Sequence, residues 1–218
     1  MTLEFNDMAK SPIEDWIEQA KKNAASGKPP NKATKTARRE KPTAAIITAA
    51  DFPVDPHLLT DAEPGSFYEI RNIAGLVPPG AGDGMDFSVG ATLEFAIQIL
   101  GVQHVIVMVS PNCGLLNCLL NEDADGIAAI VDGQYLPNWT QLTASAINRV
   151  GSANIPAEQR MRICSQELTR ISFENLMTYP WILDRVFNGS LALHGWYYDD
   201  VSGVFSWFDP AADEFVTN

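Results

Sequence analysis

Two short apolar segments constrain the fold of this chain more than any other feature. Residues 44–50 read AAIITAA and residues 104–109 read HVIVMV, and neither alternates between apolar and polar side chains. A strand that is apolar on both sides is typical of a parallel sheet, because helices cover both faces of such a sheet. The two segments therefore predict an α/β fold.

The rest of the chain agrees with this prediction. Residues 66–71 (SFYEIR) predict another strand, and LALHGWYYDD and GVFSWFD near the end predict two strands joined by a turn at Ser202–Gly203. Helical patterns cover residues 91–100 and 113–120, and residues 157–183 contain one or two helices broken by Pro180. Strands that alternate with helices indicate a mainly parallel central sheet flanked by helices, with a late antiparallel edge.

The N-terminal part differs from the rest in composition. Ser11 and Pro12 form a helix start, and apolar residues at helical spacing predict a helix over residues 12–25. Residues 26–43 are polar, basic and rich in proline, as expected of a linker or surface arm. We therefore divide the chain into residues 1–43, a helix with a basic arm, and residues 44–218, an α/β domain.

Charge excludes one class of partner. Nine of the 15 basic residues and six of the 27 acidic ones lie in residues 1–41, so the remaining 177 residues carry six Arg and 21 acids, a net charge of -15. Nucleic-acid binding needs clustered basic side chains, and this acidic body argues against it. The basic stretch of residues 32–41 is expected to wrap the acidic body of a second subunit, and docking on another acidic partner, a membrane surface or nucleic acid is the alternative.

Location is also predicted from the sequence. No run of 18 apolar residues is present, and the N-terminus has acidic residues where a signal peptide has its apolar core. The chain has an odd number of cysteines, and they lie in apolar or helical contexts: Cys113, Cys118 and Cys164. We therefore do not expect a framework of disulfide bonds. We expect a cytoplasmic protein without a membrane span.

Four segments in order resemble the β-class carbonic anhydrases: ITAADFPVDP, FYEIRNIAGLVPP, GATLEFAIQILGVQHVIVMVSPNCG and ISFENLMTYPWILDRVFNGSLALHGWYYD. The resemblance covers residues 44–200. It implies an α/β sheet, an N-terminal helical arm that lies across a partner subunit, and homodimers or higher multiples of dimers.

The resemblance also implies where the family's zinc ligands would lie. In that family a Cys-x-Asp-x-Arg loop and a His-x-x-Cys motif supply the ligands and an Asp–Arg pair. Aligned to this sequence, the loop falls on Ala49, Asp51 and Pro53, and the second motif falls on Ser110 and Cys113. Two of the three zinc ligands and the arginine are thus replaced, and we expect no zinc and no other cofactor.

Ligand chemistry leads to the same expectation. Zinc takes four ligands, mainly thiolate, imidazole and carboxylate, whereas the methyl group of Ala49 has no lone pair and the neutral hydroxyl of Ser110 is a poor ligand. Without the ion, nothing lowers the pKa of a water from about 15.7 to about 7. We therefore expect no catalytic residue. Asp51 is expected to cap a turn or helix, with a role as a base as the alternative, and Cys113 is expected to pack at a strand-to-helix turn.

Other residues near these positions are altered as well. Phe52 and Pro53 are bulkier or stiffer than the small polar residue and the Arg of the family, which predicts a partly plugged pocket. Gly90 and Gly75 replace the Ser and Asn of some family members. The Arg71–Asn72 pair is expected to brace the core and subunit interface.

The three histidines are not expected to restore the zinc site. His104 begins the strand that ends near Ser110 and so lies about 20 Å away. His57 follows the loop and is expected to start a helix, and His194 is expected to be structural.

Three hypotheses for function follow. The first is a zinc-free protein without carbon dioxide hydration activity, which acts as a binding, regulatory or structural subunit, partnered by itself, by an active carbonic anhydrase or by another protein. The second is a carbonic anhydrase or related hydrolase with a non-standard or metal-free site. The third is a sensor of bicarbonate or another small anion.

Overall fold

The computed structural model describes Ile17, Lys21 and residues 41–80, 87–121, 124–152 and 155–217. By its internal contacts the chain divides into two units, residues 1–40 and residues 41–218. The predicted N-terminal helix and basic arm lie almost wholly outside the described residues, although Ile17 and Lys21 are helical. The paragraphs below concern the second unit.

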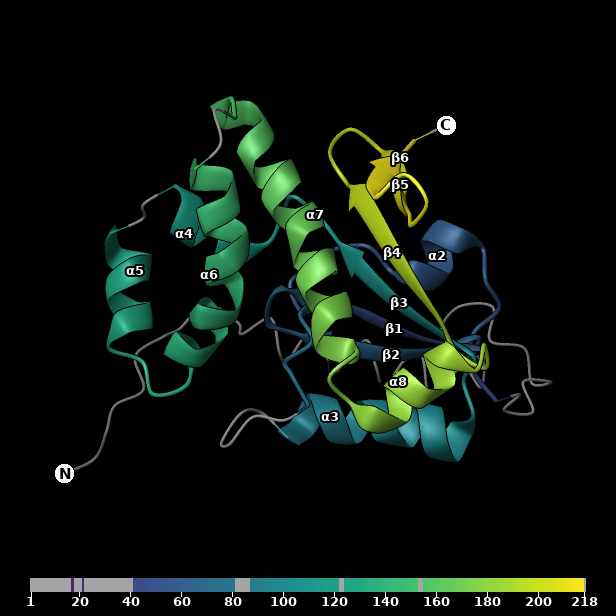
Figure 1. Ribbon diagram of the computed structural model, residues 1–218. Helices are drawn as coiled ribbons and strands as arrows, with labels where there is room; N and C mark the ends of the chain where they lie inside the picture. Colours follow the sequence, from purple (N-terminus) through teal and green to yellow (C-terminus); the bar gives the residue numbers. More distant parts are fainter. Residues whose placement is uncertain are drawn as a thin grey trace. The chain divides into compact units, whose positions relative to one another are not determined.

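A six-stranded sheet, with strand order β2-β1-β3-β4-β5-β6, forms the centre of this unit (Figure 1). The first four strands of that order are parallel, and β5 and β6 are antiparallel to their neighbours. This arrangement confirms the predicted parallel centre with a late antiparallel edge. The strands are β1 (Ala44–Ala49), β2 (Phe67–Asn72), β3 (His104–Val109), β4 (Ala192–Asp199), β5 (Val204–Asp209) and β6 (Glu214–Val216).

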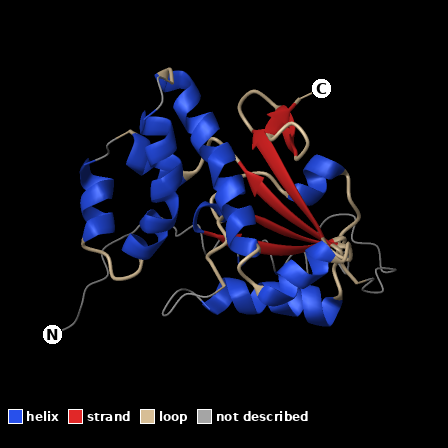
Figure 2. Cartoon of the chain, viewed as in Figure 1, coloured by secondary structure: helices blue, strands red, loops and turns tan. Residues whose placement is uncertain are grey.

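Helices connect and cover the strands (Figure 2). The helices are α2 (Pro56–Thr60), α3 (Phe87–Glu94), α4 (Gly114–Leu120), α5 (Ala124–Val131), α6 (Leu136–Ser152), α7 (Ala157–Leu176) and α8 (Pro180–Phe187), with the short η1 (Ile73–Gly75) and η2 (Phe95–Leu100), the latter a π-helix. The long helix α7 contacts β3 and β4, and α3 contacts β2 (Figure 1).

Strand β1 shows why its sequence does not alternate. Ala45 and Ile47 join the larger apolar cluster of the unit, whereas Ala44 and Ile46 join a second cluster that includes Met108. Since successive side chains of a strand point to opposite faces, both faces at β1 are buried. All six residues of the strand are buried, as the apolar run predicts.

The helix predicted over residues 91–100 begins earlier, at Phe87, and its second half is the π-helix η2. The segment predicted over residues 157–183 forms two helices, which agrees with the predicted break at Pro180. Helix α7 ends at Leu176, and Pro180 occupies the first turn of α8, where proline lacks only an N–H that would be unpaired anyway. Helix α8 continues to Phe187, beyond the predicted end.

Helices α5 and α6 were not predicted from the sequence. In α6 the side chains of Trp139, Thr143, Ala146 and Val150 are buried at spacings of three or four residues. This spacing is the signal of one buried helix face, and it was present in the sequence.

Candidate functional site

Two loops meet at the carboxyl ends of β1 and β3, which are adjacent parallel strands. The first loop contains Asp51, and the second leads through Cys113 into α4. The backbone N–H of Gly114 donates a hydrogen bond of 2.7 Å to the Oδ2 atom of Asp51. Asp51 thus caps the first turn of α4 from outside the helix. A Cβ atom at position 114 would lie 2.8 Å from the same oxygen, so the glycine permits this approach.

Ala49 ends β1 and is 6% exposed. Its backbone nitrogen lies close to Gly75, where a Cβ atom would come within 2.9 Å of it. Gly75 has a φ of +64°, a backbone conformation that residues with a Cβ atom rarely adopt. The backbone of η1 therefore packs closely against the end of β1, and the Ala49 side chain is only a methyl group.

Ser110 is held by hydrogen bonds. Its hydroxyl donates to Asp200 Oδ1 at 3.3 Å and accepts from the N–H of Asn112 at 3.1 Å. The amide of Asn112 donates to the same Asp200 oxygen at 2.6 Å. The hydroxyl of Ser165 donates to the carbonyl of Ser110 at 2.9 Å.

Asp200 is a site residue that sequence reasoning missed. Val109 pairs with Tyr197 in the register of β3 and β4, so the residues that follow these strands emerge at the same edge of the sheet. The acidic pair at the end of LALHGWYYDD was a sequence signal for this site residue. It would have predicted the contact with Ser110 only if β4 had been paired with β3 in this register.

Cys113 is buried, with 4% exposure, and belongs to the larger apolar cluster. Burial raises the pKa of its thiol from 9.0 to about 11, and the nearby charge of Asp51 adds to the increase. At neutral pH the sulfur is therefore protonated. Thiolate, rather than thiol, is the form that binds metals.

The side chain of Phe52 packs in the core, at a position where the family usually has a small polar residue. It is 4% exposed and packs with Ala49 and Met108 in the second apolar cluster. The guanidinium of Arg71 donates to the carbonyls of Phe52 at 3.0 Å and Val54 at 3.5 Å. Arg71 thus braces the loop, and its predicted role at the core and subunit interface stays a prediction.

The remaining aligned positions make no polar side-chain contact in the structure. Pro53 is exposed in the loop. Gly90 lies against Tyr179, whose ring atoms would be 3.5 Å from a Cβ at that position. The Tyr179 hydroxyl donates to the carbonyl of Pro78 at 3.0 Å.

The histidines do not meet at this site. His104 begins β3 at the other end of the strand from Ser110, and its Nδ1 atom lies 3.0 Å from Nε2 of His194. His57 lies in the first turn of α2, as predicted.

Comparison with known proteins gives the family. The chain is 30% identical to beta carbonic anhydrase 3 of Arabidopsis thaliana over 171 residues, 78% of this chain. It is 33% identical to a carbonic anhydrase of Synechococcus elongatus over 173 residues, 77% of this chain. The family model described as carbonic anhydrase matches residues 44–205. The chain belongs to the β-class carbonic anhydrase family.

Solved structures of β-carbonic anhydrases share the fold. CcaA superposes with a TM-score of 0.75 and 27% identity, covering 95% of this chain and 100% of that one. A β-carbonic anhydrase of Sordaria macrospora, described as tetrameric, has a TM-score of 0.66 at 21% identity over 90% of this chain and 97% of its own. At that identity the second likeness concerns the fold alone.

The matched region is shorter than the relatives themselves. It spans 65% of the Arabidopsis protein and 60% of the Synechococcus protein, which is less than two thirds of each. The match therefore does not assign the relatives' activity or partners to this member of the carbonic anhydrase family.

As a set of donors, the four aligned side chains do not fit a tetrahedral zinc ion. Ala49 has no donor atom, and the Ser110 hydroxyl is engaged by Asp200 and Asn112. Cys113 is buried, and Asp51 is hydrogen-bonded to Gly114. One carboxylate and one cysteine sulfur, even after a metal displaced the thiol proton, fall short of the four ligands that zinc takes.

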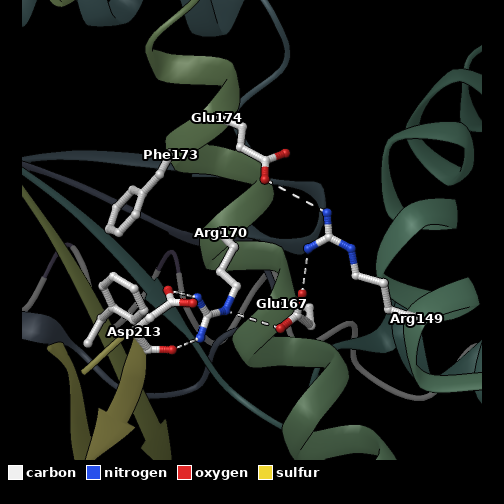
Figure 3. A pocket seen from close by; sticks show the side chains of 7 residues that line it. Arg149, Glu167, Arg170, Phe173, Glu174 and Asp213 are labelled. Atoms are coloured by element: carbon white, nitrogen blue, oxygen red, sulfur yellow. Dashed lines mark hydrogen bonds and ion pairs between the residues drawn. The ribbon is translucent and has the colours of Figure 1, made fainter. Parts of the chain in front are cut away.

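An open cavity of about 530 Å³ lies elsewhere, beside α7 (Figure 3). The charged side chains that line it form ion pairs with one another: Arg149 pairs with Glu167 and Glu174, and Arg170 pairs with Glu167 and Asp213. The guanidinium of Arg170 also lies 4.9 Å from the centre of the Phe208 ring. None of the residues that line this cavity occupies an aligned zinc position, and we assign it no function.

Within the described part of the chain, no helix has both the length and the apolar character needed to cross a membrane. The cytoplasmic location stays a prediction.

Proposed function

We propose that this protein holds no zinc at the family's position and does not hydrate carbon dioxide, and that it acts as a binding, regulatory or structural subunit. The observation that carries the proposal is the donor set at the aligned positions, where a methyl group and an engaged hydroxyl replace two of the three ligands. Without the ion, no group at the site generates hydroxide at neutral pH.

The wild-type protein tests this proposal directly. In stopped-flow assays of carbon dioxide hydration, we expect the rate to equal the uncatalysed rate, both for chelator-treated protein and after zinc is added. Hydration above background in either state would overturn the proposal.

The second candidate function is hydration by a non-standard site. One observation favours it: Asp51 remains exposed, at hydrogen-bond distance from a backbone N–H that could orient it. In this case the wild type would be active, and Asp51→Asn would remove the activity while leaving the cap geometry available through the amide oxygen. The same assay on this variant separates the two functions.

We further propose that the protein forms a homodimer through an apolar stripe on α3 and η2. Phe87, Ala91, Phe95 and Ile99 recur at every fourth residue and are exposed, on the opposite side from the buried Val89 and Leu93. Exposed apolar side chains grouped in this way are typical of interaction surfaces.

The stripe adjoins β2, which is an edge of the sheet that the described residues form. The Phe95 ring lies 6.0 Å from that of Tyr68 on β2, and β2 is the edge strand. An edge strand has unpaired backbone groups that a second copy of the chain can pair.

A charge placed on the stripe should dissociate the dimer. We expect Phe95→Glu to shift the mass measured by light scattering from dimer to monomer, because a carboxylate buried at an interface loses its hydration. Val201→Glu is the matched control, since Val201 is 84% exposed at the turn between β4 and β5. A Phe95→Glu protein that keeps the dimer mass would place the interface elsewhere.

Partners other than a second copy are part of the same proposal. An active carbonic anhydrase or another protein could occupy the stripe in a mixed assembly. The arm of residues 1–43, predicted to wrap a neighbouring subunit, lies outside the described residues apart from Ile17, Lys21 and residues 41–43.

A further inference from the structure

One histidine and two carboxylates form a compact group near the loop that follows β1. Asp55 precedes α2, His57 lies in its first turn, and Glu69 lies on β2. One ligand atom from each residue lies within 4.8 Å of the other two. None of the three occupies a position aligned with the family's zinc ligands.

The His57 imidazole lies within ion-pair distance of both carboxylates, at separations longer than those of a strong hydrogen bond. The Nδ1 atom of His57 lies 3.4 Å from Oδ1 of Asp55 and 3.2 Å from Oε1 of Glu69. Hydrogen bonds between a charged nitrogen and a carboxylate are shorter, about 2.7–2.9 Å. Zinc bonds of about 2.0–2.1 Å at tetrahedral angles place neighbouring ligand atoms about 3.3–3.4 Å apart. The two distances therefore also suit ligands around a shared ion of the zinc type.

The imidazole is already oriented for this role. The backbone N–H of His57 donates to Oδ1 of Asp55 at 2.8 Å, which ties the two residues together at the start of α2. The His57 ring lies 5.0 Å from the Phe67 ring, and its side chain is 16% exposed. Among the described residues its Nε2 atom has no hydrogen-bond partner, so the ring makes its polar contacts through Nδ1.

Glu69 is held from its other side. Its Oε2 atom lies 3.4 Å from Nε of Arg71, which leaves Oε1 facing His57. With a neutral imidazole, the two carboxylates and Arg71 sum to one negative charge. A divalent cation would offset the negative charge that this group and the acidic body share.

We propose that Asp55, His57 and Glu69 bind one divalent transition-metal ion of the zinc type. An imidazole nitrogen with two carboxylate oxygens suits such ions, whereas magnesium and calcium prefer oxygen ligands alone. The ion joins α2 to β2, and its fourth position is open to water. This inference does not rest on the proposed function, because the site is separate from the aligned positions and makes no claim about hydration.

Zinc titration of the chelator-treated, full-length protein tests the site. We expect one zinc ion per chain by isothermal titration calorimetry, a higher melting temperature on zinc addition, and no heat from magnesium at the same concentration. His57→Gln should weaken zinc binding by more than about 100-fold, because even outer-shell changes at metal sites cost about 10–100-fold. Glu69→Gln provides a second test at a different element, and circular dichroism reports whether each variant is folded.

Two controls identify the ion's position. Asp61→Asn removes an exposed carboxylate from the end of α2, outside the group, and asparagine tolerates the φ of 53° found there. The double variant Asp51→Asn with Cys113→Ala removes the remaining donors at the aligned positions. Both should bind zinc as the wild type does.

The proposal is overturned if the wild type binds no zinc, or if His57→Gln and Glu69→Gln bind it unchanged. Loss of binding only in the Asp51→Asn, Cys113→Ala variant would place the ion at the family's position, which contradicts both this proposal and the proposed function. Hydration assayed on the same samples separates the two: activity without zinc would overturn the proposed function and leave the cation site intact.

Discussion

The triple variant Ala49→Cys, Pro53→Arg and Ser110→His is expected to gain zinc binding at the aligned site by at least about 100-fold, since it restores two ligands and even an outer-shell change at a metal site shifts affinity by about 10–100-fold. The new thiolate and imidazole would join Cys113, whose proton is displaced when a metal binds. The restored arginine would again neutralise Asp51.

The structure also indicates what resists this gain. A histidine at position 110 must replace the hydroxyl that contacts Asp200 and Asn112, and a cysteine at position 49 must fit beside the backbone of Gly75. Phe52 remains buried beside Ala49 and Met108. We therefore expect zinc binding to return more fully than carbon dioxide hydration.

The measurement is zinc stoichiometry by elemental analysis together with stopped-flow hydration. It is made in a His57→Gln background, so that the counted zinc does not come from the proposed Asp55–His57–Glu69 site. The matched control carries Ser instead of Cys at position 49, with nearly the same volume but no thiolate. Equal zinc in the variant and its control, or none in either, would mean that the ligands have been aligned wrongly.

Gly75→Ala is expected to lower the free energy of unfolding by about 2–5 kcal/mol. A methyl group there would lie 2.9 Å from the Ala49 nitrogen and 3.0 Å from the Thr48 carbonyl carbon. These atoms belong to a strand paired on both sides, so they cannot move independently. Overpacking of this kind costs about 1–3 kcal/mol, and a positive φ in a residue with a Cβ adds about 1–2 kcal/mol.

Gly101→Ala separates the two contributions. Gly101 has a φ of +77° at the end of η2, but a Cβ there would meet no atom within 4 Å. We expect this control to lose about 1–2 kcal/mol, from the backbone conformation alone. Urea denaturation of both variants measures the difference. Equal losses would mean that β1 shifts to accept the methyl group and that the close packing against the end of β1 does not require Gly75.

Much of the fold was predictable because it depends on local patterns. The apolar runs at β1 and β3 predicted buried strands, and the Ser202–Gly203 turn predicted the hairpin of β4 and β5. Helices α5 and α6 were missed although α6 has one buried face at helical spacing. The helix predicted over residues 91–100 begins four residues earlier, at Phe87, and the sequence pattern did not distinguish its second half, η2, as a π-helix.

The sequence by itself determined the family and the kinds of donor atom at the aligned positions, because ligand chemistry belongs to residue identity: an alanine has no lone pair in any fold. Only the tertiary structure decided what the remaining groups contact. Asp51 caps α4, Ser110 binds Asp200, and His57 faces Glu69. In each contact the two partners are far apart in the sequence or belong to different elements. Such contacts depend on strand register and loop path, which arise from packing of the whole domain.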